Sequence, residues 1–204
     1  MKKQHIIAVK AFVWVLALSP LARLIWLGFN EDLGANPVEF IEHSTGTWAL
    51  VILLVTLAMT PIRLITGIVW QVQLRRVLGL FMFFYACLHI ITYVWLDFAF
   101  IWVDIVKDVA KHPRILVGFA GFLLTIPLAI TSNNAMMRRM KSNWKKLHQT
   151  VYLISILAVL HFWLLVKKDV TEPFAYAVVL SILLGTRLYF RYKTKQKVAI
   201  KPSV

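Results

Sequence analysis

The chain has 204 residues, a formal net charge of +14 and an apolar content of 60%, with a mean hydropathy of +0.73. Soluble domains hold roughly 45–50% apolar residues, and the 16% of charged residues here cluster between long apolar runs. These values exclude an ordinary soluble domain and predict a single membrane-embedded domain over residues 1–204. The single cysteine, Cys87, excludes an intrachain disulfide and a cysteine-based metal site.

Six apolar segments approach the length of about 20 residues that a helix needs to cross the hydrocarbon core. In chain order they are residues 7–29, 46–65, 77–97, 115–131, 149–166 and 173–190. Lys2 and Lys3 precede the first segment, but no small-residue cleavage site follows, so we interpret it as a retained span. The expected fold class is all-α, a polytopic bundle of six transmembrane helices. No internal repeat is visible in the residues.

The charges are distributed unequally between the two sides of these spans. Seventeen of the 23 Lys and Arg residues fall in segments 1–10, 63–76, 132–148 and 187–204, and all nine acids fall on the other side. The positive-inside rule therefore predicts that both termini are cytoplasmic. Topology and anionic lipid explain the basic loops, so the positive charge does not indicate nucleic-acid binding.

Two histidines, His89 and His161, lie inside predicted spans, where an ionisable residue suggests a functional site. Each stands 12 residues from the predicted cytoplasmic start of its span, or roughly 18 Å deep at about 1.5 Å per residue. Two imidazoles at matched depth on two helices are suited to be the axial ligands of one b-type haem. The alternative interpretation is that each imidazole only hydrogen-bonds a neighbouring helix.

A second group of candidates lies nearer the cytoplasmic side. His148 precedes His161 by 13 residues, a rise of roughly 20 Å, which suits a second haem. On an ideal helix the two side chains would diverge by about 140°, so a kink or an unwound turn is needed. The matching position on the third span is Arg76, beside Arg75. Arginine is a poor iron ligand but pairs well with a haem propionate; the alternative is a pair of topogenic charges.

The sixth candidate residue is His43, in the segment Glu42-His43-Ser44-Thr45-Gly46, which is expected just outside the second span. Two interpretations stay open. The segment is either a turn in which Ser44 or Thr45 caps the following helix, which residue chemistry favours, or a site where His43 binds a propionate or a quinone headgroup.

Other kinds of site are not indicated. The sequence has no Gly-rich phosphate loop and no His-Glu-x-x-His motif. No acid falls at mid-membrane, which argues against carboxylate-coupled ion transport. The alternative to a haem protein is a non-redox membrane transporter or an assembly scaffold, which would be colourless.

Several segments resemble a known family. They are LGANPVEFIEHSTGTWAL at 33–50, TPIR at 60–63, RRVLGLF at 75–81, CLHIITY at 87–93 and TSNNAMMRRMKSNWKKLHQTVYL at 131–153, followed by His161. With these segments the chain resembles the haem-binding membrane subunit of the periplasmic protein–methionine-sulfoxide reductase system, the MsrQ (formerly YedZ) family. That family belongs to the ferric-reductase-like transmembrane group, which includes the NADPH oxidases.

The resemblance implies a multi-pass protein of the bacterial inner membrane that is an electron-transfer subunit and not the catalytic one. It implies one or two b-type haems, with His89, His148 and His161 as the iron-ligating residues, and it associates FMN with the family. The implied donor is the quinol pool or a cytoplasmic flavin reductase. The implied acceptor is a periplasmic molybdopterin reductase of the MsrP kind, which repairs methionine sulfoxide in proteins.

Overall fold

The computed structural model describes residues 3–166 and 168–199. Within these residues, six helical segments are long and apolar enough to cross a membrane, as the sequence predicts. They are α1 (Lys3–Phe29), α2 (Pro37–Thr66), the segment Trp70–Asp97, α5 (Pro113–Ile130), the segment Ser142–Leu165 and α9 (Thr171–Ala199). The protein is therefore an all-helical, polytopic membrane protein.

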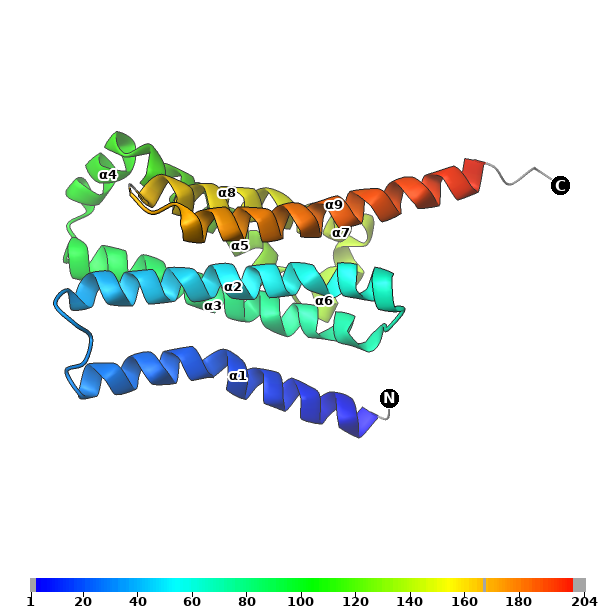
Figure 1. Ribbon diagram of the computed structural model, residues 1–204, viewed down its shortest axis with the longest axis horizontal. Helices are drawn as coiled ribbons and strands as arrows, with labels where there is room; N and C mark the ends of the chain where they lie inside the picture. Colours follow the sequence, from blue (N-terminus) through cyan, green and yellow to red (C-terminus); the bar gives the residue numbers. More distant parts are fainter. Residues whose placement is uncertain (1–2, 167, 200–204) are drawn as a thin grey trace.

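The spans alternate in direction, and α1 begins at the same end of the bundle at which α9 ends (Figure 1). We call this the near end; the short α6 (Asn134–Met140) lies there, between α5 and α7. The opposite end, the far end, holds the α1–α2 connection and the short α4 (Trp102–Lys111). Basic residues predicted to be cytoplasmic thus gather at the near end.

The start of α2 differs from the expectation by nine residues. The side chain of Asn36 accepts a hydrogen bond from the backbone N–H of Glu39, and Pro37 occupies the first turn. Asparagine is a preferred N-cap, and proline fits the first turn because its missing N–H would have no partner there. His43 consequently lies inside α2, and the expected cap at Ser44 or Thr45 is wrong: the Thr45 hydroxyl donates to Ile41 O instead.

The third and fifth spans are interrupted helices. The third opens with the 3₁₀ turn η1 (Trp70–Leu74), continues as α3 (Arg75–Thr92) and closes with the π-helical turn η2 (Tyr93–Asp97). The fifth is α7 (Ser142–His148) followed by α8 (Val151–Leu165). Gln149 and Thr150 break the helix between His148 and His161, which is the interruption that two inward-facing histidines require.

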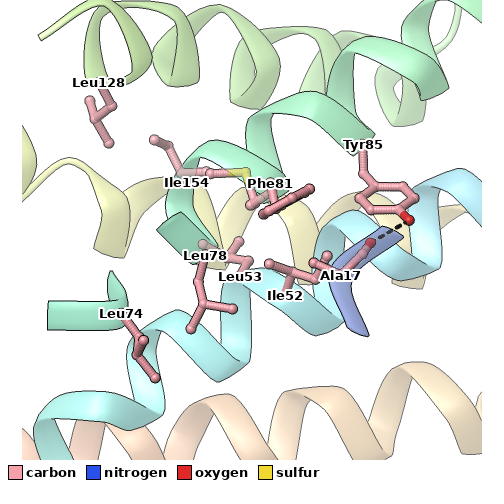
Figure 2. Close-up of a cluster of buried hydrophobic side chains, with 10 residues drawn as sticks. Ala17, Ile52, Leu53, Leu74, Leu78, Phe81, Tyr85, Leu128 and Ile154 are labelled. Carbon is pink, nitrogen blue, oxygen red and sulfur yellow. Dashed lines mark hydrogen bonds between the residues drawn. The ribbon is translucent and has the colours of Figure 1, made fainter. Parts of the chain in front are cut away.

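The helices pack as two antiparallel pairs. The most extensive contacts are those of α2 with α3 and of α5 with α8, and the pairs join through α3 with α5 and α2 with α8. Buried apolar side chains fill the space between them, and Figure 2 shows this cluster, which includes Leu53, Phe81 and Ile154. The two pairs form the frame on which the candidate site is built.

Tyr85 of α3 attaches α1 to this frame. Its hydroxyl donates to Ala17 O at 2.7 Å (Figure 2) and accepts from the Leu21 N–H at 3.2 Å. The hydroxyl therefore bridges a carbonyl and an N–H that an uninterrupted helix would join directly. Pro20 lies beside this position and leaves Leu16 O without its helical donor; the Ser19 hydroxyl donates to that carbonyl.

Arg187 attaches α9 in a similar way. Its guanidinium donates to Tyr152 OH of α8 at 2.7 Å and to Leu57 O of α2, and it lies 5.2 Å from the centre of the Tyr152 ring. One half-buried cation thus connects three helices.

Candidate functional site

His89 of α3 and His161 of α8 meet inside the bundle. Their ring centroids are 6.2 Å apart, and the ring planes are inclined at 70°. The two residues come from different helix pairs, so each pair contributes one imidazole. The structure thus brings together the two histidines that the depth calculation singled out.

Both imidazoles are oriented by backbone carbonyls. His89 Nδ1 is 3.1 Å from Glu42 O of α2, and His161 Nδ1 is 2.7 Å from Arg114 O of α5. Since a carbonyl only accepts, each Nδ1 must carry the proton, and each Nε2 is left with a free lone pair. Such a second hydrogen bond is the usual way in which proteins orient metal-binding histidines.

Two glycines make room for the rings. A Cβ added to Gly46 of α2 would lie 3.1 Å from His89 Cε1, and a Cβ added to Gly118 of α5 would lie 2.6 Å from both Cε1 and Nδ1 of His161. Real Cβ atoms essentially never lie as close as 2.6 Å, and 3.1 Å is tighter than most of their contacts. The sequence pattern alone indicates no role for either glycine.

The two halves of the site follow one rule. In each, the histidine stands 47 residues after the carbonyl that binds it, and the glycine stands four residues after that carbonyl. The helices of the two halves also run in the same order and direction, α2 then α3 and α5 then α8 (Figure 1). The structure therefore contains an internal repeat that the residues alone did not reveal.

His148, Arg75 and Arg76 line one cavity of about 740 Å³ at the near end. Arg75 and Arg76 belong to the third span and His148 to the fifth. The sequence alone did not show that these two spans are neighbours. His148 is stacked on Trp144, with ring centroids 3.9 Å apart, and its Nε2 is 3.0 Å from the Thr131 hydroxyl. That hydroxyl already donates to Pro127 O, so His148 Nε2 donates to it.

The two arginines of the cavity carry charge that no described acidic side chain neutralises. Arg76 donates to the neutral Asn134 side chain at 2.7 Å. Neither arginine forms an ion pair with a carboxylate among the described residues. The cavity therefore offers unneutralised positive charge and an imidazole to a ligand that carries acidic groups.

His43 does not join either group. It lies one helical turn before Gly46, and its ring is 5.8 Å from that of Phe162, edge to face. Among the described residues, its side chain makes this aromatic contact and no hydrogen bond. Phe83, which lines the near-end cavity, is stacked on Phe122 of α5 at 6.1 Å.

The fold and the site together define a class: six-span membrane proteins in which two helix pairs each present one histidine to a shared interior site. The family described as "Ferric reductase like transmembrane component" matches residues 45–170. Several curated relatives, each named "Protein-methionine-sulfoxide reductase heme-binding subunit MsrQ", match nearly the whole chain. The protein of Xanthomonas campestris pv. campestris (strain B100) is 47% identical over 97% of this chain and 94% of its own.

The relative from Xanthomonas axonopodis pv. citri (strain 306) is 48% identical over 95% of this chain and 92% of its own. The relative from Ralstonia nicotianae is 46% identical over 95% and 90%. The chain belongs to the MsrQ family, within the ferric-reductase-like transmembrane group. No solved structure matches it.

Proposed function

We propose that this protein is the electron-transfer subunit of a protein–methionine-sulfoxide reductase system and holds a b-type haem between His89 and His161. The observation that carries the proposal is the paired imidazoles, 6.2 Å apart, each with Nδ1 bound to a carbonyl. The names of the relatives, which describe a heme-binding subunit, support it.

The residues present fit a haem. Imidazole nitrogens bind first-row metal ions at roughly 2.0–2.1 Å, so two rings on opposite sides of one ion have centroids about 6 Å apart. Among the described residues no group of three or more His, Cys, Asp or Glu side chains gathers to surround a bare ion. Two imidazoles are sufficient for a haem iron, because the macrocycle supplies the other four ligands.

The haem would be held without covalent attachment. Attachment of a c-type haem uses a Cys-x-x-Cys-His motif, and this chain has only Cys87. When bound, a haem supplies one-electron chemistry. The protein's own residues fix the ligands and exclude water: the two carbonyls set the ring orientation, and the glycines let helices α2 and α5 close over the rings.

The near-end cavity is the proposed place of a second haem. Its volume of about 740 Å³ falls within the 300–1,000 Å³ of sites that enclose small molecules and cofactors. Arg75 and Arg76 would pair with propionates, and His148 would supply an axial ligand. His148 is less prepared to bind iron than His89 and His161, because its Nε2 is hydrogen-bonded to the Thr131 hydroxyl. FMN is the alternative occupant, since its phosphate would find the same arginines.

The charge distribution supports a direction of transfer. With the basic near end in the cytoplasm, electrons from the quinol pool or a cytoplasmic flavin reductase would enter beside the cavity. They would leave by the His89–His161 site, whose anchoring carbonyls lie in the second turn of α2 and the first turn of α5, at the far end. There a periplasmic molybdopterin reductase of the MsrP kind would dock. The bilayer would be the bacterial inner membrane.

The test is the absorption spectrum of the detergent-purified protein, oxidised and reduced with dithionite, with haem quantified per chain. His89→Ala and His161→Ala should each abolish the haem of the pair. His5→Ala, which changes an exposed histidine of α1, should leave it unchanged. A full reduced band in both single variants would overturn the assignment, and a well-folded wild-type protein without colour would overturn the redox function.

The acceptor is tested separately. The pre-reduced protein is mixed with the molybdopterin reductase and a protein substrate that contains methionine sulfoxide. Re-oxidation of the haem that requires both components supports the proposed partner. Re-oxidation at the same rate without these components would contradict the proposed acceptor.

A further inference from the structure

Helix α4 presents three separate faces around its circumference. At 100° per residue, one face carries exposed apolar residues, one carries exposed charges, and one packs on the bundle. The apolar stripe is Trp102, Val103, Val106 and Ala110; the charged face is Asp104, Lys107 and Lys111; the bundle face is Ile105, Asp108 and Val109.

The apolar stripe is largely exposed in the isolated chain. Trp102 and Val103 are each 64% exposed and Val106 is 66% exposed, whereas Ile105, on the bundle face, is 6% exposed. An exposed apolar stripe beside a charged face is the pattern of a helix that lies in a membrane surface. The sequence pattern of the six spans did not predict this element.

Short connections on both sides keep α4 at the far end of the bundle. Four residues, Phe98 to Ile101, connect it to the third span, and His112 alone connects it to Pro113 of α5. It runs across the far end of the bundle and not along the spans (Figure 1). Exposed apolar residues also continue from the third span to the stripe, through Trp95, Leu96, Phe100 and Ile101, with Asp97 as the one exposed charged residue among them.

From this continuity we infer that α4 lies in the lipid–water interface at the far end, with its apolar stripe on the lipid and Lys107 and Lys111 facing water. Tryptophan is enriched at that depth, and Trp102 begins the stripe. The helix contains two Lys and two Asp residues, so its charges cancel. Seating therefore depends on buried apolar area and not on anionic lipid, unlike the basic near end.

The interface position has a structural role. Asp108 accepts from Tyr93 OH at 2.8 Å and from His112 Nδ1 at 2.8 Å. Asp108 thereby connects Tyr93, four residues after His89 in the third span, to His112, the residue before α5. Helix α5 in turn carries Arg114, whose carbonyl binds His161. A helix fixed at the lipid surface would hold both ends of the histidine site in place. The inference itself does not depend on haem.

The experiment places a fluorescent reporter on each face of α4 in the full chain. In a Cys87→Ala background, Val103→Cys and Val106→Cys report on the stripe, and Lys107→Cys and Lys111→Cys are matched controls on the same helix. Each variant carries an NBD label in nanodiscs of neutral phosphatidylcholine. Quenching by iodide in the water is compared with quenching by lipids that carry a shallow doxyl group.

The expected result is that labels at 103 and 106 are quenched several-fold more by doxyl lipid, and several-fold less by iodide, than labels at 107 and 111. Adding phosphatidylglycerol should change neither ratio. Equal iodide quenching at all four positions would overturn the proposal, because the stripe would then stand in water. Protection of 103 and 106 from both quenchers would also overturn it, because a second protein surface would then cover the stripe.

Discussion

Gly118 and His161 approach so closely that no larger residue fits at position 118. A Cβ there would lie 2.6 Å from the imidazole, against 3.1 Å for the corresponding Gly46–His89 contact. The two halves of the repeated arrangement thus differ in how closely the glycine approaches the ring, and the α5 half is the tighter one.

We expect Gly118→Ala to displace the His161 ring from Arg114 O and to remove or strongly reduce the bound haem. Gly46→Ala should have a smaller effect, because a shift of a few tenths of an ångström relieves its contact. The measurement is haem per chain together with the reduced absorption band. Gly185→Ala is the matched control: this glycine is helical with open space around it, and alanine there should stabilise by about 0.5–1 kcal/mol. Equal haem content in all three variants would contradict the steric argument.

His148→Ala should affect the near-end cavity alone. We expect haem per chain to fall from two to one while the spectrum of the His89–His161 haem persists. His148 and His161 lie on separate helices, α7 and α8, so a change at His148 should not move His161. Thr131→Val removes the hydroxyl that occupies His148 Nε2 and should not lower the haem content. Loss of both haems in His148→Ala would show that the two sites are not independent.

Tyr85→Phe tests the attachment of α1. The variant loses the hydroxyl that bridges Ala17 O and the Leu21 N–H, and it should lower the free energy of unfolding by about 0.5–1.5 kcal/mol. Thermal unfolding in detergent, followed by circular dichroism, measures the change. Tyr192→Phe, at an exposed position, is the control and should unfold like the wild type. An unchanged midpoint in Tyr85→Phe would mean that Ala17 O and the Leu21 N–H simply bond to each other.

Arg187→Met should loosen α9. It removes a cation that bonds to Tyr152 and to Leu57 O, and hydrogen bonds of a charged group contribute about 1.5–3 kcal/mol. We expect faster proteolysis of the C-terminal helix and a lower unfolding midpoint. Arg191→Met, four residues later on an exposed surface, should change neither. Identical behaviour of the two variants would show that α9 is held by apolar contacts alone.

The six spans could be predicted because hydropathy over about 20 residues reports directly on the membrane. The meeting of His89 and His161 could be anticipated because depth along a helix is proportional to residue number. Their roles as haem ligands remain a prediction, as do those of His148, Arg75 and Arg76.

Other features depend on contacts that one-dimensional patterns do not contain. The early start of α2 is set by Asn36 and Pro37, a local signal that an apolar window overlooks. Helix α4 has too few apolar residues to register as a span. The roles of Gly46 and Gly118 appear only when the facing ring is in place, although the shared spacing of 47 residues was present in the sequence.

That shared spacing has an implication for the origin of the protein. Each half consists of one carbonyl, one glycine and one histidine on two antiparallel helices. Such a half is an incomplete site, because it offers a metal a single ligand. A free helix pair of this kind would have completed the site only by associating with its own copy. The arrangement is what duplication and fusion of such a pair would leave, with α1 and α9 as later additions at its flanks. Divergence would then have given one copy His148 and the other Arg76.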